Sequence, residues 1–197
     1  MGCQDTYHVG SIKGVGRIYQ QTFIDSYSKV VQVKLYDRKH AITAADLLND
    51  RVLPWYEAQV LPVLRILTDR GSEYCGHREH HDYELYLDLE GIDHTRTRTK
   101  SPQTNGICER FHQTIVNAFI KPSRMSSTPP LSGARSTPAW KQLQTDVDAW
   151  IDAYNRERAH SGKYCFGKTP WQTFCEAKPL ALAKQLDRTV PTTMTTP

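Results

Sequence analysis

Three acidic residues of this chain stand where carboxylates could share metal ions. Asp5 lies in a short alternating segment, Asp69 follows the apolar run VLRIL, and Glu109 comes one turn after an Asn-Gly pair. Carboxylate oxygens suit Mg²⁺ or Mn²⁺. Two such ions about 3.5–4 Å apart can activate an attacking oxygen and stabilise a leaving one. The three acids therefore indicate metal-dependent phosphoryl transfer.

The element that would carry Glu109 is a helix predicted to begin at 106 or 107 and to run to 120. Ser101-Pro102 disfavours helix before it, because proline pushes the preceding residue toward extended backbone. Glu109 lies off the apolar stripe of this helix, so the alternative interpretation is a surface glutamate favoured by the helix dipole. Four apolar residues recur at a spacing of four and predict the buried stripe: Ile107, Phe111, Ile115 and Phe119.

The other two acids would be positioned by strands. Residues 1–10, 17–25 and 30–36 alternate or are apolar and are joined by short connections, which predicts an antiparallel meander. Residues 63–67 predict a central strand, so that Asp69 would lie at its carboxyl end, where open α/β sheets place their ligands. Helical spacing predicts further helices in these segments: 44–59, ended or kinked by Pro54; 77–90, stopped by Gly91; 139–159; and a short one from 170.

A row of basic residues precedes the helix of Glu109. Residues 92–100 alternate with period two, which predicts a strand or extended segment with one basic face. An edge strand could carry this charge only to avoid aggregation. Because the row leads into the turn before Glu109, we instead expect it to bind backbone phosphate. The predicted DNA-contacting residues are Arg96, Arg98, Lys100, Gln103, Asn105 and Arg110.

The net charge, the apolar runs and the cysteines limit which partners and locations fit this chain. A net charge of +4 permits a polyanionic partner without demonstrating one. The chain has no apolar run of membrane-spanning length and no basic-then-apolar leader, so we expect a cytoplasmic protein with no membrane partner. The five cysteines include no CxxC pair and are expected to be reduced. Cys75, His77, His80 and His81 could form a zinc site, but a second pair of ligands at finger-like spacing is missing.

Three segments resemble one protein family. CQDTYHVGSIKG, TDRGSEY and SPQTNGICERFHQTI are similar to the catalytic core of the retroviral-integrase-like DDE transposases of bacterial insertion sequences. The resemblance implies an α/β, ribonuclease-H-like fold, with a mixed five-stranded sheet flanked by helices. It implies that Asp5, Asp69 and Glu109 are the catalytic and metal-binding residues, with two Mg²⁺ or Mn²⁺ ions. Asp25 in FIDSYSK is a rival for the first acid.

The family resemblance also implies a function and a domain organisation. We expect DNA strand cleavage and strand transfer on transposon ends and target DNA, by an enzyme that could form a homo-oligomer on DNA and act at the bacterial nucleoid. The alternatives are a catalytically silent remnant that only binds DNA and a generic nuclease of the same fold. The predicted organisation is a catalytic core at 1–120, a flexible insertion at 121–138, helices packing on the core at 139–178 and a disordered tail at 179–197.

Overall fold

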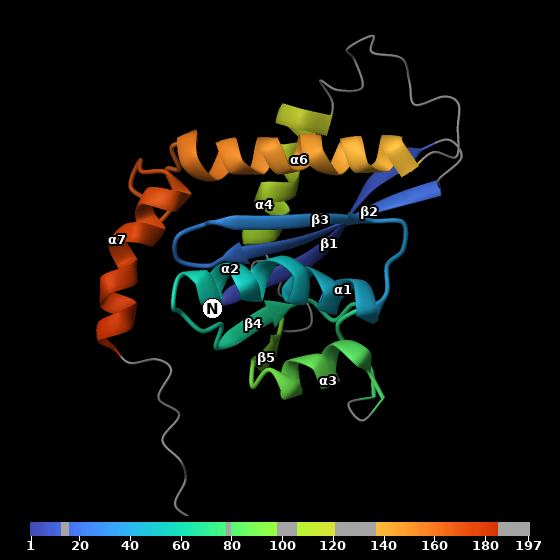
Figure 1. Ribbon diagram of the computed structural model, residues 1–197, viewed down its shortest axis with the longest axis horizontal. Helices are drawn as coiled ribbons and strands as arrows, with labels where there is room; N and C mark the ends of the chain where they lie inside the picture. The colour runs from blue at the N-terminus through green and yellow to red at the C-terminus, as the bar shows by residue number, and fades with distance from the viewer. Residues whose placement is uncertain (13–15, 78–79, 98–105, 121–136, 185–197) are drawn as a thin grey trace, which may run out of the picture.

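A computed structural model describes residues 1–12, 16–77, 80–97, 106–120 and 137–184. Its centre is one sheet of five strands in the order β3-β2-β1-β4-β5 (Figure 1). The first three strands pair antiparallel, whereas β1–β4 and β4–β5 pair parallel. This confirms the predicted mixed sheet. The strands are β1 Gly2–Ile12, β2 Gly16–Asp25, β3 Val31–Tyr36, β4 Arg65–Thr68 and β5 Asp93–Arg96.

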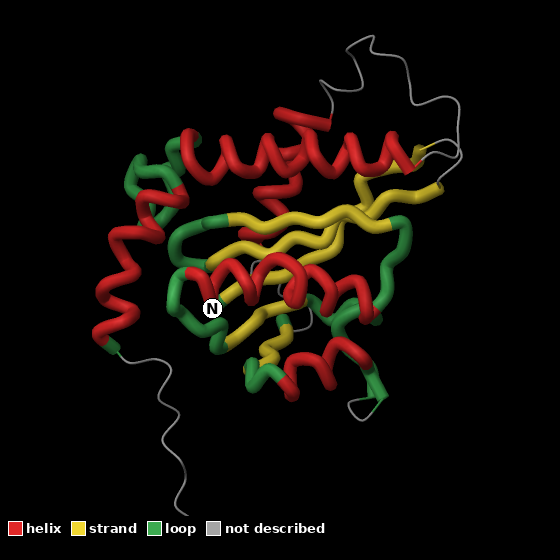
Figure 2. The backbone as a smooth tube through the Cα atoms, viewed as in Figure 1, coloured by secondary structure: helices red, strands yellow, loops and turns green. Residues whose placement is uncertain are grey.

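Helices cover both faces of the sheet (Figures 1 and 2). On one face, the apolar side chains of β1–β3 pack against α4 (Gly106–Ile115) and α6 (Thr137–Glu157). On the other face, Phe23 of β2 and Ile66 of β4 pack against α1 (Ala41–Leu47), α2 (Leu53–Ala58) and α3 (Asp82–Leu89). Two separate cores result because successive residues of a strand point to opposite faces.

Pro54 does not end the helix predicted at 44–59, although an end at this proline was one of the two predicted outcomes. A π-helical turn, η1 (Leu48–Val52), separates α1 from α2, and Pro54 occupies the first turn of α2. Proline has no N–H to donate, and the wider turn before it accommodates that missing hydrogen bond. The helix therefore continues to Ala58. A second π-helical turn, η3 (Val116–Ile120), extends α4 in the same way without a proline.

Other helix ends follow the sequence signals. α3 stops before Gly91, whose φ is +66°, in the left-handed region that glycine adopts without strain. α7 (Pro170–Ala183) begins with a capping box, in which the Thr169 hydroxyl accepts from the Gln172 N–H at 3.1 Å. α7 continues through Pro179 to Ala183, so the tail expected to be disordered from 179 begins as helix.

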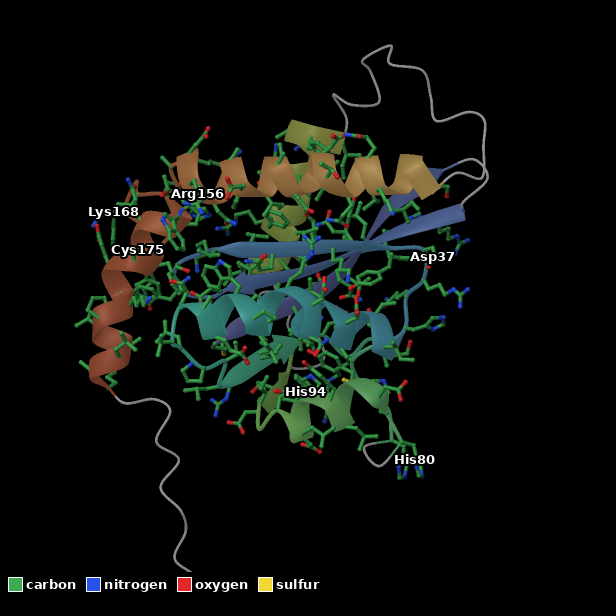
Figure 3. All side chains as sticks on the ribbon, viewed as in Figure 1. Asp37, His80, His94, Arg156, Lys168 and Cys175 are labelled. Carbon is green, nitrogen blue, oxygen red and sulfur yellow. The ribbon has the colours of Figure 1, made fainter. Side chains whose placement is uncertain are left out.

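The junction of α6 and α7 is held by aromatic and charged side chains. The Arg156 guanidinium lies 5.1 Å from the centre of the Trp171 ring, and Lys168 pairs with Glu176; Figure 3 labels Arg156 and Lys168 at this junction. Residues 121–136, most of the predicted insertion, lie outside the described residues. No helix in the described part of the chain has the length and apolar character needed to span a membrane.

Candidate active site

The register of the parallel strands places Asp5 beside Asp69. Cys3 of β1 pairs with Leu67 of β4, and both side chains belong to the core on the α4 face. Asp5 and Asp69 each lie two residues further along their strands, and the side-chain period of a strand is two. Both carboxylates therefore lie on the α4 face, one past the end of β4 and the other in the middle of β1.

α4 brings Glu109 to the same place. Its buried residues Cys108, Phe111 and Ile115 pack on the sheet, which leaves Glu109 exposed at the helix edge. Glu109 and Asp5 line one open cavity of about 470 Å³. The helix thus lies across the sheet with its carboxylate facing the strand that carries the first acid.

The charges of these acids act on one another. Burial is the main cause that raises the pKa of Asp5 to about 7, and the charges of Asp69, Glu73 and Glu109 raise it further. A hydrogen bond from the Thr6 N–H to Asp5 Oδ1, at 2.9 Å, lowers the pKa in part. Four carboxylates from three parts of the chain therefore share one electrostatic environment, which a cation would stabilise.

Glu73 is a member of this cluster that the sequence analysis did not single out. It is 2% exposed; its Oε1 lies 2.9 Å from Lys39 Nζ, and its buried Oε2 has no hydrogen-bond partner among the described residues. Gly71 lies close to both acids, because a Cβ on it would lie 2.4 Å from Glu73 Oε2 and 3.0 Å from Asp69 Oδ1, so a larger residue would displace the Glu73 carboxylate. The TDRGSEY segment contains Glu73, but nothing in its pattern distinguishes a buried glutamate from a solvated one.

A buried polar network supports β1 from its other face. The Tyr74 hydroxyl lies 2.8 Å from Thr6 Oγ1 and donates to Gln21 Oε1 at 3.0 Å. Gln21 Nε2 in turn donates to Thr6 Oγ1 at 3.0 Å, and Tyr83 donates to Gln4 Oε1 at 2.8 Å. These bonds tie the loop after Asp69 to Thr6, and they tie α3 to Gln4, so both neighbours of Asp5 in β1 are held from the face opposite the acids.

His112 closes the cavity one turn after Glu109. Its ring stacks on Tyr7 with centroids 4.9 Å apart, and its Nε2 lies 3.0 Å from Thr22 Oγ1. Its Nδ1 lies 3.8 Å from Asp5 Oδ2, but burial lowers the pKa of His112 to about 4. At neutral pH the ring is therefore uncharged and does not neutralise Asp5. The sequence analysis did not predict this contact.

Asp25, the rival for the first acid, has a different role in the fold. Its Oδ1 accepts from the N–H groups of Tyr27 and Ser28 at 2.9 and 2.7 Å, and its Oδ2 accepts from the Tyr56 hydroxyl at 2.9 Å. It pairs with Gly2 in the β1–β2 ladder, three residues before Asp5. Asp25 therefore closes the turn between β2 and β3.

The predicted phosphate-binding residues are only partly described. Arg96 donates from Nη2 to both carboxylate oxygens of the buried Glu84, at 2.5 and 2.6 Å. Its guanidinium is thus engaged within the protein, although the side chain stays 40% exposed. Arg110 is exposed on α4, next to Glu109. Arg98, Lys100, Gln103 and Asn105 lie outside the described residues.

The donor set fits a hard divalent ion, although the three acids do not yet converge on one. In the described part of the chain, no group of three or more His, Cys, Asp or Glu side chains lies close enough to hold a metal ion. The clustered acids, the raised pKa of Asp5 and the partnerless Glu73 Oε2 are what an oxygen-binding cation would satisfy. Of the suggested zinc ligands, His77 stacks on His80, and His81 Nε2 lies 2.9 Å from the Ser72 carbonyl oxygen.

Comparisons of the amino-acid sequence find similarity to integrases and to a retrovirus-related transposon. Residues 90–165 match the family model described as Integrase core domain. The chain is 24% identical over 152 residues to a candidate integrase, ORF3 of Spiroplasma virus SpV1-C74, which covers 73% of this chain and 39% of that protein. It is 30% identical over 114 residues to the retrovirus-related Pol polyprotein from transposon TNT 1-94 of Nicotiana tabacum, covering 58% of this chain and 8% of that protein.

Solved structures show the same fold. The catalytic core domain of BIV integrase superposes with a TM-score of 0.61 at 17% identity, over 92% of this chain and 97% of that one. The HTLV-2 integrase catalytic core domain in complex with magnesium, in its trimeric form, gives 0.60 at 17% identity, over 87% and 93%. The sheet order and the flanking helices described above are thus those of integrase catalytic cores.

Proposed function

We propose that this chain, an integrase-like DDE transposase, cuts DNA strands and joins the freed ends to other DNA, with Asp5, Asp69 and Glu109 as its metal-binding catalytic residues. The observation that carries the proposal is the register of β1 and β4 under α4. It brings carboxylates from a strand, a strand end and a helix to one face of the sheet.

The comparisons support the coarser part of this proposal. The two sequence relatives are named as an integrase and as a polyprotein from a transposon, and two structures of the HTLV-2 integrase catalytic core domain are in complex with magnesium. The chain spans 39% and 8% of the lengths of the two sequence relatives, so the activity, substrates and partners of a whole protein belong to the proposal. We propose DNA as the partner, at transposon ends and at a target, and a homo-oligomer that assembles on it.

The acids of the candidate site and their neighbours would have different roles in the reaction. Asp5, Asp69 and Glu109 would hold two Mg²⁺ or Mn²⁺ ions, which would activate the attacking oxygen and stabilise the leaving one. Asp5 has to lose its proton before it can bind, because its pKa lies near 7 in the free protein. The Lys39–Glu73 pair ties the loop after Asp69 to the segment between β3 and α1. His112 excludes water from one side of Asp5.

The reaction needs no covalent protein–DNA intermediate. Water attacks the phosphodiester in line, and the freed 3′-OH then attacks a second phosphodiester in the same geometry. No Ser or Tyr nucleophile is required. Each step exchanges one P–O bond for another, so the joining step needs no external energy source.

The proposal is tested by nicking of supercoiled plasmid and by joining of a labelled 3′-OH oligonucleotide to it, both with Mn²⁺. Asp5→Asn, Asp69→Asn and Glu109→Gln should each remove most of both activities, because the triad acts as a unit. Asp25→Asn is the matched control and should stay active. Loss of activity in Asp25→Asn with activity retained in Asp5→Asn would refute the assignment of the first acid. Nicking without joining would favour a generic nuclease, and DNA binding without either would favour a silent remnant.

A further inference from the structure

A second cavity, of about 330 Å³, opens on the other side of α4 from the acidic one. α4 contributes Arg110 and its neighbours on one helix face, whereas Glu109 and His112 face the acidic cavity. The opposite wall is the end of α6 and the turn after it, from Arg158 to Gly162. Lys29, in the turn between β2 and β3, completes the wall. One rigid helix thus separates the two cavities.

The second cavity gathers positive charge without carboxylates. Lys29, Arg110, Arg158 and His160 line it, and no Asp or Glu of the described part of the chain is among its lining residues. Within the described residues, the structure records no ion pair for Lys29, Arg110 or Arg158. Burial, and then the charges of these three cations, lower the pKa of His160. Uncompensated positive charge in a concave site attracts anions.

An exposed aromatic ridge lies next to this cavity. Tyr27, two residues before Lys29, stacks on Tyr164 with ring centroids 4.6 Å apart, and Lys163 Nζ lies 5.0 Å from the centre of the Tyr164 ring. Phe166 is 80% exposed. Tyr164 and Phe166 both have left-handed backbone, with φ of +77° and +50°, which is costly for bulky side chains.

The loop that displays these rings is held firmly. The His160 N–H donates to the Lys168 carbonyl at 3.0 Å, and the Gly167 N–H donates back to the His160 carbonyl at 3.1 Å. Between them, the buried Cys165 thiol donates to the Ser28 carbonyl at 3.4 Å. These bonds maintain the strained backbone and keep Tyr164 and Phe166 at the surface. Such strain, held by surrounding structure, favours a binding role for the exposed rings.

We propose that the cavity lined by Lys29, Arg110, Arg158 and His160 binds a DNA backbone phosphate, and that the ridge of Tyr27, Tyr164 and Phe166 stacks an unpaired base beside it. The inference rests on the proposed function, because it names where the same DNA strand would be held. Cationic grooves flanked by aromatic rings suit single-stranded or frayed DNA, since every base has a π-face to stack. Arg110 adjoins Glu109 on α4, so a strand bound here would lie one helix width from the acids.

The test measures DNA binding by fluorescence anisotropy in EDTA, across a range of salt concentrations, for a blunt duplex and the same duplex with a single-stranded overhang. Arg158→Gln should weaken binding to both DNAs by roughly three- to tenfold and reduce the salt slope by about 0.9, the value for one phosphate contact. Phe166→Ala should weaken binding only to the overhang duplex, by roughly tenfold. Lys184→Gln is the matched control, an exposed cation at the far end of α7.

Three results would overturn the inference. The first is that Arg158→Gln binds DNA as well as Lys184→Gln does. The second is that Phe166→Ala weakens binding to both DNAs equally. The third is that Phe166→Ala alters sedimentation of the protein without altering DNA binding, which would make the ridge an interface between copies of the chain. Failure of this inference and failure of the proposed function can be told apart. If the wild-type protein cuts DNA and all cavity variants bind DNA normally, only this inference is refuted. If the wild-type protein binds neither of the two DNAs, both this inference and the proposed function are refuted.

Discussion

Asp5 and His112 lie side by side in the acidic cavity, with Asp5 Oδ2 3.8 Å from His112 Nδ1, yet they do not form an ion pair at neutral pH. Burial raises the pKa of Asp5 from 3.8 to about 7 and lowers the pKa of His112 from 6.5 to about 4. Each group is thus held toward its neutral form. Because the two pKa shifts are opposite, their effects on stability oppose each other over the same pH range.

We predict that, in metal-free protein, removing one of these two side chains leaves the other to determine how the free energy of unfolding changes with pH. Between pH 4 and 7 the folded state binds more protons at Asp5 than the unfolded state does, so Asp5 makes the free energy of unfolding fall as pH rises. Between pH 4 and 6.5 the unfolded state binds more protons at His112, which makes it rise. Relative to wild type, stability should rise with pH in Asp5→Asn and fall with pH in His112→Gln, by up to about 1.4 kcal/mol per unit.

Urea denaturation at pH 4.5, 5.5 and 6.5 in EDTA measures these slopes. Asp37→Asn removes an exposed carboxylate outside the cavity and is the control; its profile should run parallel to that of the wild type. Both cavity variants running parallel to wild type would contradict the burial argument.

Divalent ions should stabilise the fold through the acid cluster. At ten times its dissociation constant, Mg²⁺ should add about 1.4 kcal/mol to the free energy of unfolding, which raises Tm by roughly 3–6 °C in a chain of this size. The increase should be larger at pH 8 than at pH 6, because Asp5 has to be ionised to bind. Differential scanning fluorimetry checks this. Glu109→Gln should lose most of the increase; an equal increase in that variant would place the ion elsewhere.

The Lys39–Glu73 ion pair should stabilise the fold by more than a typical surface ion pair does, although Lys39 itself is exposed. Lys39→Met leaves a 2% exposed carboxylate without its cation and should destabilise the protein by about 1–3 kcal/mol. The double variant Lys39→Met/Glu73→Gln should recover part of this loss, because the remaining amide carries no charge. Chemical denaturation of the four proteins forms a double-mutant cycle. Arg38→Met, which removes a neighbouring exposed cation, should change stability little.

Arg96 and Arg98, which the sequence places in one basic row, should behave differently. Arg96→Ala leaves the buried Glu84 without its guanidinium and should lower stability, by about 1–3 kcal/mol. Arg98→Ala should instead weaken binding to all duplexes alike and reduce the salt slope by about one. Thermal unfolding and anisotropy titrations distinguish the two. A change of sequence preference in Arg98→Ala at constant affinity would refute its assignment to phosphate.

Local chemistry was sufficient to predict most elements of the fold. Alternation predicted the antiparallel strands, helical spacing predicted α4 and α6, and Gly91 and Thr169 ended and began their helices as their backbone preferences require. The sequence also supplied the acids Asp5, Asp69 and Glu109 as candidates. These signals lie within a few residues of the feature that they predict, so no tertiary contact is needed to recognise them.

The contacts between distant residues were decided only by the tertiary structure. The pairing of Cys3 with Leu67 sets Asp5 beside Asp69, and it depends on the register of two strands more than sixty residues apart. The partner of Arg96 proved to be a buried glutamate on another element, and the burial of Glu73 has no local signal. The pKa of Asp5 likewise follows from desolvation and from charges that the fold brings near. A carboxylate has the same chemistry wherever it occurs in a sequence, and its neighbours and its access to water determine what it can bind.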